Sequence, residues 1–169
     1  MTLPVVVGIS GASGAIYGIE TLKALRELGH ESHLVISNSG ARIIALETDF
    51  SLDEVRALAG QTHAAGDVGA NVASGSFLTK GMIVAPCSIK TLSGIANSHA
   101  DSLLVRAADV TLKERRPLVL MVRETPLHKG HLRLMEKAFG LGALILPPMP
   151  AFYTKPESIT DIVRHSVAR

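Results

Sequence analysis

The sequence predicts a single α/β domain across residues 1–169, with a mostly parallel sheet of about five strands enclosed by two layers of helix. Two observations support this prediction. Short runs rich in Val, Ile and Leu alternate with segments of helical period, which is the order of βαβ units. The apolar runs hardly alternate with polar residues, as expected for strands covered on both faces. This is the three-layer arrangement of flavodoxin-like and Rossmann-like folds.

The apolar runs place five strands at residues 4–9, 32–36, 82–85, 118–122 and 143–146. Helices are expected at 15–28, 39–46, 88–96, 102–115 and 131–139, with Gly29 and Gly140 where C-caps belong. Residues 51–54 (SLDE) form a capping box that opens a further short helix, and Ser158 begins a last helix that runs to the chain end. Residues 60–80 are rich in Gly, Ala and Ser and are expected to form a long loop.

Composition narrows the classes of protein. With 169 residues, 47% of them hydrophobic and 19% charged, the chain is long and apolar enough for one folded core. The net charge of +2 and the short basic runs argue against nucleic acid as a partner. No apolar stretch is long enough for a membrane span, and the first residues lack the pattern of a secretory signal. We therefore expect a soluble, cytoplasmic enzyme or binding module.

Small polar residues and glycines follow every predicted strand. In open parallel sheets, ligands bind beyond the carboxyl ends of the strands, near the point where the strand order reverses. Glycines let backbone amides approach a ligand there, and helix N-termini favour anions. One such strand end could simply cap a helix, but five together indicate a site for a ring-containing ligand with a phosphate. The segments are residues 10–14 (SGASG), 37–40 (SNSG), 86–91 (PCSIKT), 123–126 (RETP) and 147–153 (PPMPAFY).

The glycine spacing indicates which phosphate ligand fits. Residues 8–14 (GISGASG) do not follow the G-x-G-x-x-G pattern of dinucleotide sites, and they lack the Lys-Ser/Thr ending of a P-loop. Hydroxyl groups spread over three loops are more typical of a mononucleotide site of the flavodoxin-like kind. Ser88 and Thr91, near a predicted helix start, are the candidate phosphate ligands.

The cysteine and the histidines give weaker signals. Cys87 follows a strand, where a helix dipole can lower a thiol pKa, but no positioned base accompanies it, so packing is favoured over a nucleophilic role. A single cysteine also excludes an internal disulfide. The seven histidines lack metal-ligand spacing, and His128 and His131 span a predicted loop-to-helix junction. We expect no metal.

Several charged residues are candidates for chemistry. Glu47 ends a predicted helix, where an acid opposes the helix dipole, so it is either a solvated helix end or a functional acid. Glu124 follows a strand beside Arg123, which can tune its pKa. Arg106 and Lys113 are seven residues apart on one helix, hence on the same face and about 10 Å apart.

The helix that carries Lys113 leads into the fourth predicted strand. Lys113 should therefore lie at the amino ends of the strands, opposite the carboxyl ends where the ligand is expected. Either this face is a solvated charged surface, or its cations reach a ligand bound to a neighbouring subunit. Tyr153, Lys155 and Arg169 flank the last loop and helix, where they could close over an anionic second substrate.

Six segments together resemble one known family. They are residues 8–18 (GISGASGAIYG), 47–49 (ETD), 86–94 (PCSIKTLSG), 106–117 (RAADVTLKERRP), 123–126 (RETP) and 150–153 (PAFY). The set resembles the UbiX-type flavin prenyltransferases, which were long labelled aromatic-acid decarboxylases. The resemblance covers nearly the whole chain, and the joint set of motifs is highly specific.

The resemblance implies a metal-independent enzyme that joins the dimethylallyl group of dimethylallyl phosphate to N5 and C6 of reduced FMN and releases phosphate. The product, prenylated FMN, would serve a UbiD-type decarboxylase, with ubiquinone biosynthesis and phenolic-acid metabolism both open as the pathway. A single FMN-binding flavoprotein domain over residues 1–169, assembled as a homododecamer, is also implied.

The resemblance assigns roles to individual residues. The catalytic residues would be Ser13, Glu47, Lys113 and Glu124, with the serine and the two acids handling protons. Dimethylallyl phosphate would be bound by Arg106, Lys113, Tyr153 and Arg169, some of them across a subunit interface. FMN would be bound by Gly11, Ala12, Ser13, Ser37, Ser88, Ile89, Lys90, Thr91 and Arg123.

Two other functions stay open at this point. A flavin-dependent cysteinyl decarboxylase would need a catalytic histidine early in the fold and an Asn-bearing motif late in it, and neither has a convincing counterpart. A non-catalytic FMN carrier would need the flavin site but not the cations of a second site. The face that carries Arg106 and Lys113, together with the Tyr153 loop, favours prenyl transfer.

Overall fold

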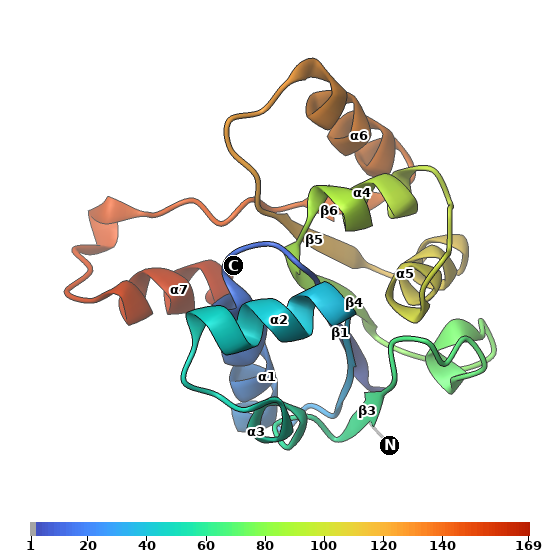
Figure 1. The fold of residues 1–169 in the computed structure, drawn as a ribbon, viewed down its shortest axis with the longest axis horizontal. Coiled ribbons are helices and arrows are strands. Elements are labelled where there is room, and N and C mark those ends of the chain that lie inside the picture. The colour runs from blue at the N-terminus through green and yellow to red at the C-terminus, as the bar shows by residue number, and fades with distance from the viewer. Residues whose placement is uncertain (1–2) are drawn as a thin grey trace.

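The computed structural model describes residues 3–169 and shows a six-stranded, all-parallel sheet with helices on both faces (Figure 1). The strand order is β3-β2-β1-β4-β5-β6. The predicted α/β class is therefore confirmed, with one strand more than expected. The order runs outward in both directions from β1 and β4, so it reverses between those two strands.

Five of the strands coincide with the predicted apolar runs. They are β1 (Val5–Ile9), β2 (Ser32–Ile36), β4 (Gly81–Cys87), β5 (Leu118–Val122) and β6 (Ala143–Ile145). The helices are α1 (Ala15–Glu27), α2 (Asn38–Glu47), α3 (Leu52–Arg56), α4 (Ile89–Ala96), α5 (Leu103–Lys113), α6 (Lys129–Gly140) and α7 (Ile159–Ala168). The predicted capping box opens α3, and Ser158 caps α7.

The segment predicted as one long loop contains two short elements. Strand β3 (Gln61–His63) pairs in parallel with β2, and the 3₁₀ helix η1 spans Asn71–Ala73. β3 was missed because it has three residues and no apolar run, since it lies at the edge of the sheet. A second 3₁₀ helix, η2 (Phe152–Thr154), interrupts the chain between β6 and α7.

One of the two predicted helix-ending glycines is misplaced. Gly29 follows α1 with the left-handed φ of 71° that such a position requires. Gly140 is instead the last residue of α6, and Gly142 takes the left-handed conformation with φ of 107°. The last turn of α6 therefore continues past Gly140, with Leu141 as its C-cap.

Neighbouring residues of the central strands pack into two separate cores. Val7 and Leu34 pack on the side of α1 and α2. Val6 and Val35 pack on the side of α4 and α5. Because successive strand residues point to opposite faces, strands that are apolar throughout need a helical layer on each face. Among residues 3–169, no helix combines the length and the apolar character that crossing a membrane requires.

A glycine lets α1 pack closely on the sheet. A Cβ atom at Gly18 would overlap the carbonyl oxygen of Ala85 in β4 and the side chain of Ile9 in β1. Gly18 therefore allows α1 to lie directly over the two central strands. Since α1 starts from the loop after β1, this contact also fixes the position of that loop.

Replacing Gly18 by Ala should lower the free energy of unfolding by about 2 kcal/mol, because the added methyl group overpacks α1 against β4. Gly140→Ala is the matched control, since a Cβ atom there meets nothing within 4 Å. Chemical denaturation of both variants measures the change. Equal stability of the two variants would contradict the close packing of α1.

Candidate functional site

Ser10 joins the two loops that meet where the strand order reverses. Its hydroxyl is buried, donates to the carbonyl of Pro86 at 2.8 Å and accepts from the amide of Ser88 at 2.8 Å. Gly11 and Ala12 continue the loop after β1, and a side chain at Gly11 would overlap α2. The loop after β1 is therefore held against both the β4–α4 turn and α2.

Ser37 and Ser88 cap the first turns of α2 and α4. The Ser37 hydroxyl accepts from a backbone amide in its first turn at 3.0 Å. The Ser88 hydroxyl accepts from the amide of Thr91 at 3.3 Å and donates to the hydroxyl of Thr91 at 3.1 Å, with Ile89 and Lys90 in the same turn. Both helix N-termini follow carboxyl ends of strands, so their dipoles favour an anion at this edge.

Glu47, at the end of α2, accepts hydrogen bonds from the N-terminus of α1. Its Oε2 accepts from the amides of Gly14 at 2.7 Å and Ala15 at 3.4 Å, at the start of α1. Burial raises the pKa of Glu47, but hydrogen bonds from Ser13 and these two amides, with the charge of Arg123, hold it below its ordinary value. The positive end of α1 thus explains an acid that opposes the dipole of its own helix.

Arg123 and Glu124 follow β5 beside this cluster. The amide of Arg123 donates to the carbonyl of Cys87 at 3.1 Å, which ties the end of β5 to the β4–α4 turn. Glu124 is exposed and accepts from the amide of the next residue at 3.0 Å. The fold therefore gathers Ser13, Glu47 and Arg123 into one group and leaves the Glu124 carboxylate at its margin.

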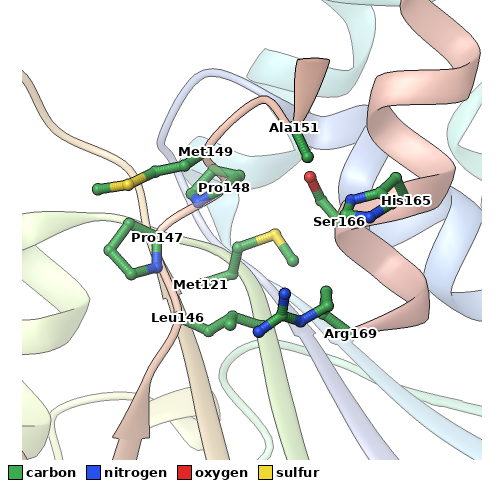
Figure 2. A pocket seen from close by; sticks show the side chains of 9 residues that line it. All are labelled: Met121, Leu146, Pro147, Pro148, Met149, Ala151, His165, Ser166 and Arg169. Atoms are coloured by element: carbon green, nitrogen blue, oxygen red, sulfur yellow. The ribbon is translucent and has the colours of Figure 1, made fainter. Parts of the chain in front are cut away.

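A pocket of about 160 Å³ lies between the end of β5, the chain after β6 and α7 (Figure 2). Figure 2 shows the Arg169 side chain reaching toward Leu146 and Met121. Apolar walls with one guanidinium and one imidazole suit a small apolar group that carries an anionic end. The lining residues are Met121, Leu146, Pro147, Pro148, Met149, Ala151, His165, Ser166 and Arg169.

Tyr153 is connected to the same helix as Arg169. Its hydroxyl lies 3.2 Å from Nε2 of His165, and the two rings meet edge to face with centroids 5.7 Å apart. His165 belongs to α7, and Arg169 is the C-cap of α7. Tyr153 and Arg169, both predicted to bind the same substrate, therefore depend on the placement of one helix.

Arg106 and Lys113 join neither group within one chain. The Arg106 guanidinium pairs with Asp109 at 3.2 Å, and the Lys113 ammonium pairs with Glu114. Lys113 ends α5, which leads into the amino end of β5, whereas the loops that carry the hydroxyl groups follow the carboxyl ends. As the sequence predicted, Lys113 lies near the amino ends of the strands, on the side of the sheet opposite the hydroxyl-bearing loops.

The cysteine and the paired histidines are explained by the fold. Cys87 is fully buried, and burial raises its pKa to about 12, which agrees with packing and disfavours a thiolate nucleophile. His128 caps α6 by accepting amides of its first turn and stacks on His131 with ring centroids 3.5 Å apart. Within residues 3–169, no group of three or more His, Cys, Asp or Glu side chains could hold a metal ion.

Two organising residues were not predicted. A serine directly after a strand was a visible signal at Ser10, but the sequence does not distinguish a bridge between loops from a helix cap. His165 was missed because its contact with Tyr153 spans an irregular segment, which has no periodicity to connect the two positions.

Comparison with known proteins now identifies the family. The sequence model described as Flavoprotein matches residues 2–169. The flavin prenyltransferase UbiX of Escherichia coli (strain K12) is 61% identical over 165 residues, which cover 97% of this chain and 87% of that protein. An identity of this size over nearly the whole length confirms the resemblance seen in the motifs.

Two solved structures share the fold closely. A UbiX crystal structure in complex with FMN and dimethylallyl pyrophosphate gives a TM-score of 0.98 at 50% identity, covering 99% of this chain and 89% of that chain. A dodecameric FMN-dependent UbiX-like decarboxylase from Escherichia coli O157:H7 gives 0.97 at 50% identity, covering 99% and 92%. The chain therefore belongs to the flavoprotein family and, within it, to the UbiX-type flavin prenyltransferases.

Proposed function

We propose that this protein is a flavin prenyltransferase that joins the dimethylallyl group of dimethylallyl phosphate to N5 and C6 of reduced FMN. The allylic C–O bond breaks and phosphate leaves as the prenyl group forms bonds to N5 and C6, which each give up a proton. One of these protons adds across the prenyl double bond, which is lost, and the other leaves with the phosphate. The observation that carries the proposal is the group of Ser13, Glu47 and Arg123 beside two helix N-termini. The identity to UbiX enzymes supports the same reaction.

The residues at the carboxyl edge of the sheet fit FMN. The hydroxyls of Ser37, Ser88 and Thr91 lie at the N-termini of α2 and α4, where the helix dipoles stabilise a phosphate. The glycine-containing loop 10–14 allows a flat ring to approach the backbone. When bound, reduced FMN supplies the nucleophilic atoms N5 and C6. We assign FMN binding to Gly11, Ala12, Ser13, Ser37, Ser88, Ile89, Lys90, Thr91 and Arg123.

We assign proton transfer beside the flavin ring to Ser13 and Glu47. The Glu47 carboxylate is ionised at neutral pH, and the nearby Ser13 side chain is among the groups that lower its pKa. A carboxylate in that state can take a proton through the serine hydroxyl. Glu124, at the margin of the group, is assigned to proton transfer at the departing phosphate.

The donor phosphate is assigned to cations from two subunits. As the allylic C–O bond breaks, negative charge grows on the phosphate, and preorganised cations stabilise it. Tyr153 and Arg169 would come from one subunit, and Arg106 and Lys113 from a neighbour. The apolar walls of the adjoining pocket, such as Met121 and Leu146, would keep water from the reacting carbons.

A site of this kind requires an assembly of several copies, because Lys113 lies at the far edge of its own sheet. We propose a homododecamer, the assembly named for the UbiX-like relative from Escherichia coli O157:H7. The product would pass to a UbiD-type decarboxylase in the cytoplasm. Ubiquinone biosynthesis and phenolic-acid metabolism are the two pathways that such a product could serve.

The reaction is tested anaerobically with the purified protein, reduced FMN and dimethylallyl phosphate. Mass spectrometry of the released flavin should find FMN heavier by one prenyl unit, with matching release of phosphate. The same assay with dimethylallyl pyrophosphate measures which donor is preferred. Unmodified flavin from assembled, FMN-binding protein would overturn the proposed reaction.

Replacing Glu47 by Gln should keep FMN bound but slow prenyl transfer by about 100-fold, because a neutral amide cannot accept the proton. Flavin fluorescence measures binding, and the mass assay measures turnover. Wild-type kinetics would reduce Glu47 to a helix cap.

The same variant has a predicted pH signature in stability. Because the pKa of Glu47 is lowered in the folded state, its charge stabilises the fold fully above its ordinary pKa of 4.5. That contribution is lost as the pH falls through the lowered pKa. Wild type should exceed Glu47→Gln by less than about 1 kcal/mol at pH 7, because the exposed carboxylate is screened by solvent, and the two should converge in acid.

Lys113→Ala should bind FMN normally and slow prenyl transfer by about 100-fold, because the donor phosphate loses one cation. Lys137→Ala is the matched control, since Lys137 is an exposed lysine in the last turn of α6 that binds Asn97. Initial rates at saturating FMN measure both. Equal rates for the two variants would remove Lys113 from the site.

A further inference from the structure

Helix α7 carries one of the two proposed donor residues that one chain supplies, Arg169, and contacts the other, Tyr153. His165 contacts the hydroxyl of Tyr153, and Arg169 follows at the end of the helix. His165 and Arg169 are four residues apart and line the same pocket, so they share one side of the helix (Figure 2). A shift of α7 would therefore move both donor contacts together.

Helix α7 packs on α1 with one fully buried apolar side chain, Val163, and with Ile162 and Val167 half-buried. Of its ten residues, only Val163 and Ser166 are buried, and Ile159 is 81% exposed. The Ser166 hydroxyl bonds within its own helix, to the carbonyl of Ile162 at 3.1 Å. Apolar packing of this kind allows some sliding of one helix on another, so a directional polar contact to α1 can fix the position of α7 along it.

The neighbour is α1, and the polar contact is an ion pair. Arg164 Nε lies 3.3 Å from Oε2 of Glu20, whose side chain is only 8% exposed. The other carboxylate oxygen, Oε1, accepts from Lys23 on α1 itself at 2.6 Å. Lys23 already pairs with this buried carboxylate, and Arg164, whose own side chain is 67% exposed, links the same carboxylate to α7.

Glu20 stays ionised in this place. Burial raises its pKa, but the hydrogen bonds and charges of Lys23 and Arg164 together hold the pKa below its ordinary value. The attachment of α7 therefore persists at neutral pH. Because α1 also begins at the loop that holds Ser13 and Gly14, one helix carries the flavin loop and fixes the donor helix.

We propose that the Glu20–Arg164 ion pair positions the donor site. It fixes α7 on α1 so that Arg169 and Tyr153 bind the prenyl phosphate at the correct distance and orientation relative to the flavin. This inference rests on the proposed prenyl transfer. Glu20 and Arg164 act through α7 and touch neither substrate. Small misplacements of binding groups are costly to a reaction that depends on alignment, so the loss of the pair should affect the donor selectively.

The two partners of Glu20 provide a matched pair of variants. Arg164→Gln breaks the link to α7, whereas Lys23→Gln removes an equal charge from the same carboxylate without touching α7. Arg164→Gln should raise KM for dimethylallyl phosphate by about fivefold and leave FMN affinity unchanged. Lys23→Gln should leave both values at the wild-type level, and Arg164→Lys should restore much of the donor affinity.

Amide hydrogen exchange gives a readout apart from turnover. In Arg164→Gln, residues 159–168 should exchange faster than in wild type, while α1 and the rest of the sheet keep their protection. Lys23→Gln should show wild-type exchange in α7. Calorimetric titration with dimethylallyl phosphate, on protein that holds oxidised FMN, measures donor affinity without the reaction.

The outcomes distinguish a failure of the proposed reaction from a failure of the proposed role of the ion pair. If wild-type protein yields no prenylated flavin, the proposed function itself fails. If wild type is active but Arg164→Gln keeps the wild-type KM and exchange, the ion pair is not a positioning device. An equal rise in KM for Lys23→Gln would also overturn the inference, because a general disturbance of Glu20 would then explain the effect.

Discussion

The buried hydroxyl of Ser10 is the contact on which the arrangement of the site depends. A hydroxyl buried away from water needs hydrogen-bond partners within the protein. This one donates to the carbonyl of Pro86 and accepts from the amide of Ser88. It therefore sets the separation of the two loops that flank the reversal of the strand order. The helix N-termini proposed to bind a phosphate converge because those loops are held together.

Helix α1 extends this organisation through two glutamates. Glu47, at the far end of α2, stabilises the N-terminus of α1, while Glu20 on its flank binds Arg164 of α7. Each carboxylate is unfavourable when judged by its own surroundings, one at the negative end of a helix and the other buried. Each becomes favourable only in the folded molecule, because its partner comes from a distant segment. Both carboxylates therefore depend on the exact tertiary fold, and both lie on or beside the helix that starts at the proposed site.

The limits of the sequence prediction follow from the same distinction. The central strands and their helices were predicted because burial on both faces leaves a local record in apolar runs such as 118–122. The start of α4 near Ser88 was predicted because a helix cap is local as well. β3, the link through Ser10 and the contact between Tyr153 and His165 were not predicted, since their partners are set by tertiary packing. The partner of Glu47, left open by the sequence, is likewise identified only by the fold.

The position of Lys113 has a consequence for how the proposed enzyme works. The proposed FMN contacts would come from loops that one chain brings together, whereas the proposed donor contacts would be divided between the C-terminal segment of one copy and the opposite end of another copy's strands. The edge strand β6 and the end of α6 expose Phe139, Leu141 and Leu144, a group of apolar side chains that association can cover. On this proposal, flavin binding would be a property of the single fold, and donor binding would be a property of the assembly. The allylic C–O bond would be activated only where assembled subunits also shield the pocket from water, so that association and chemistry are coupled.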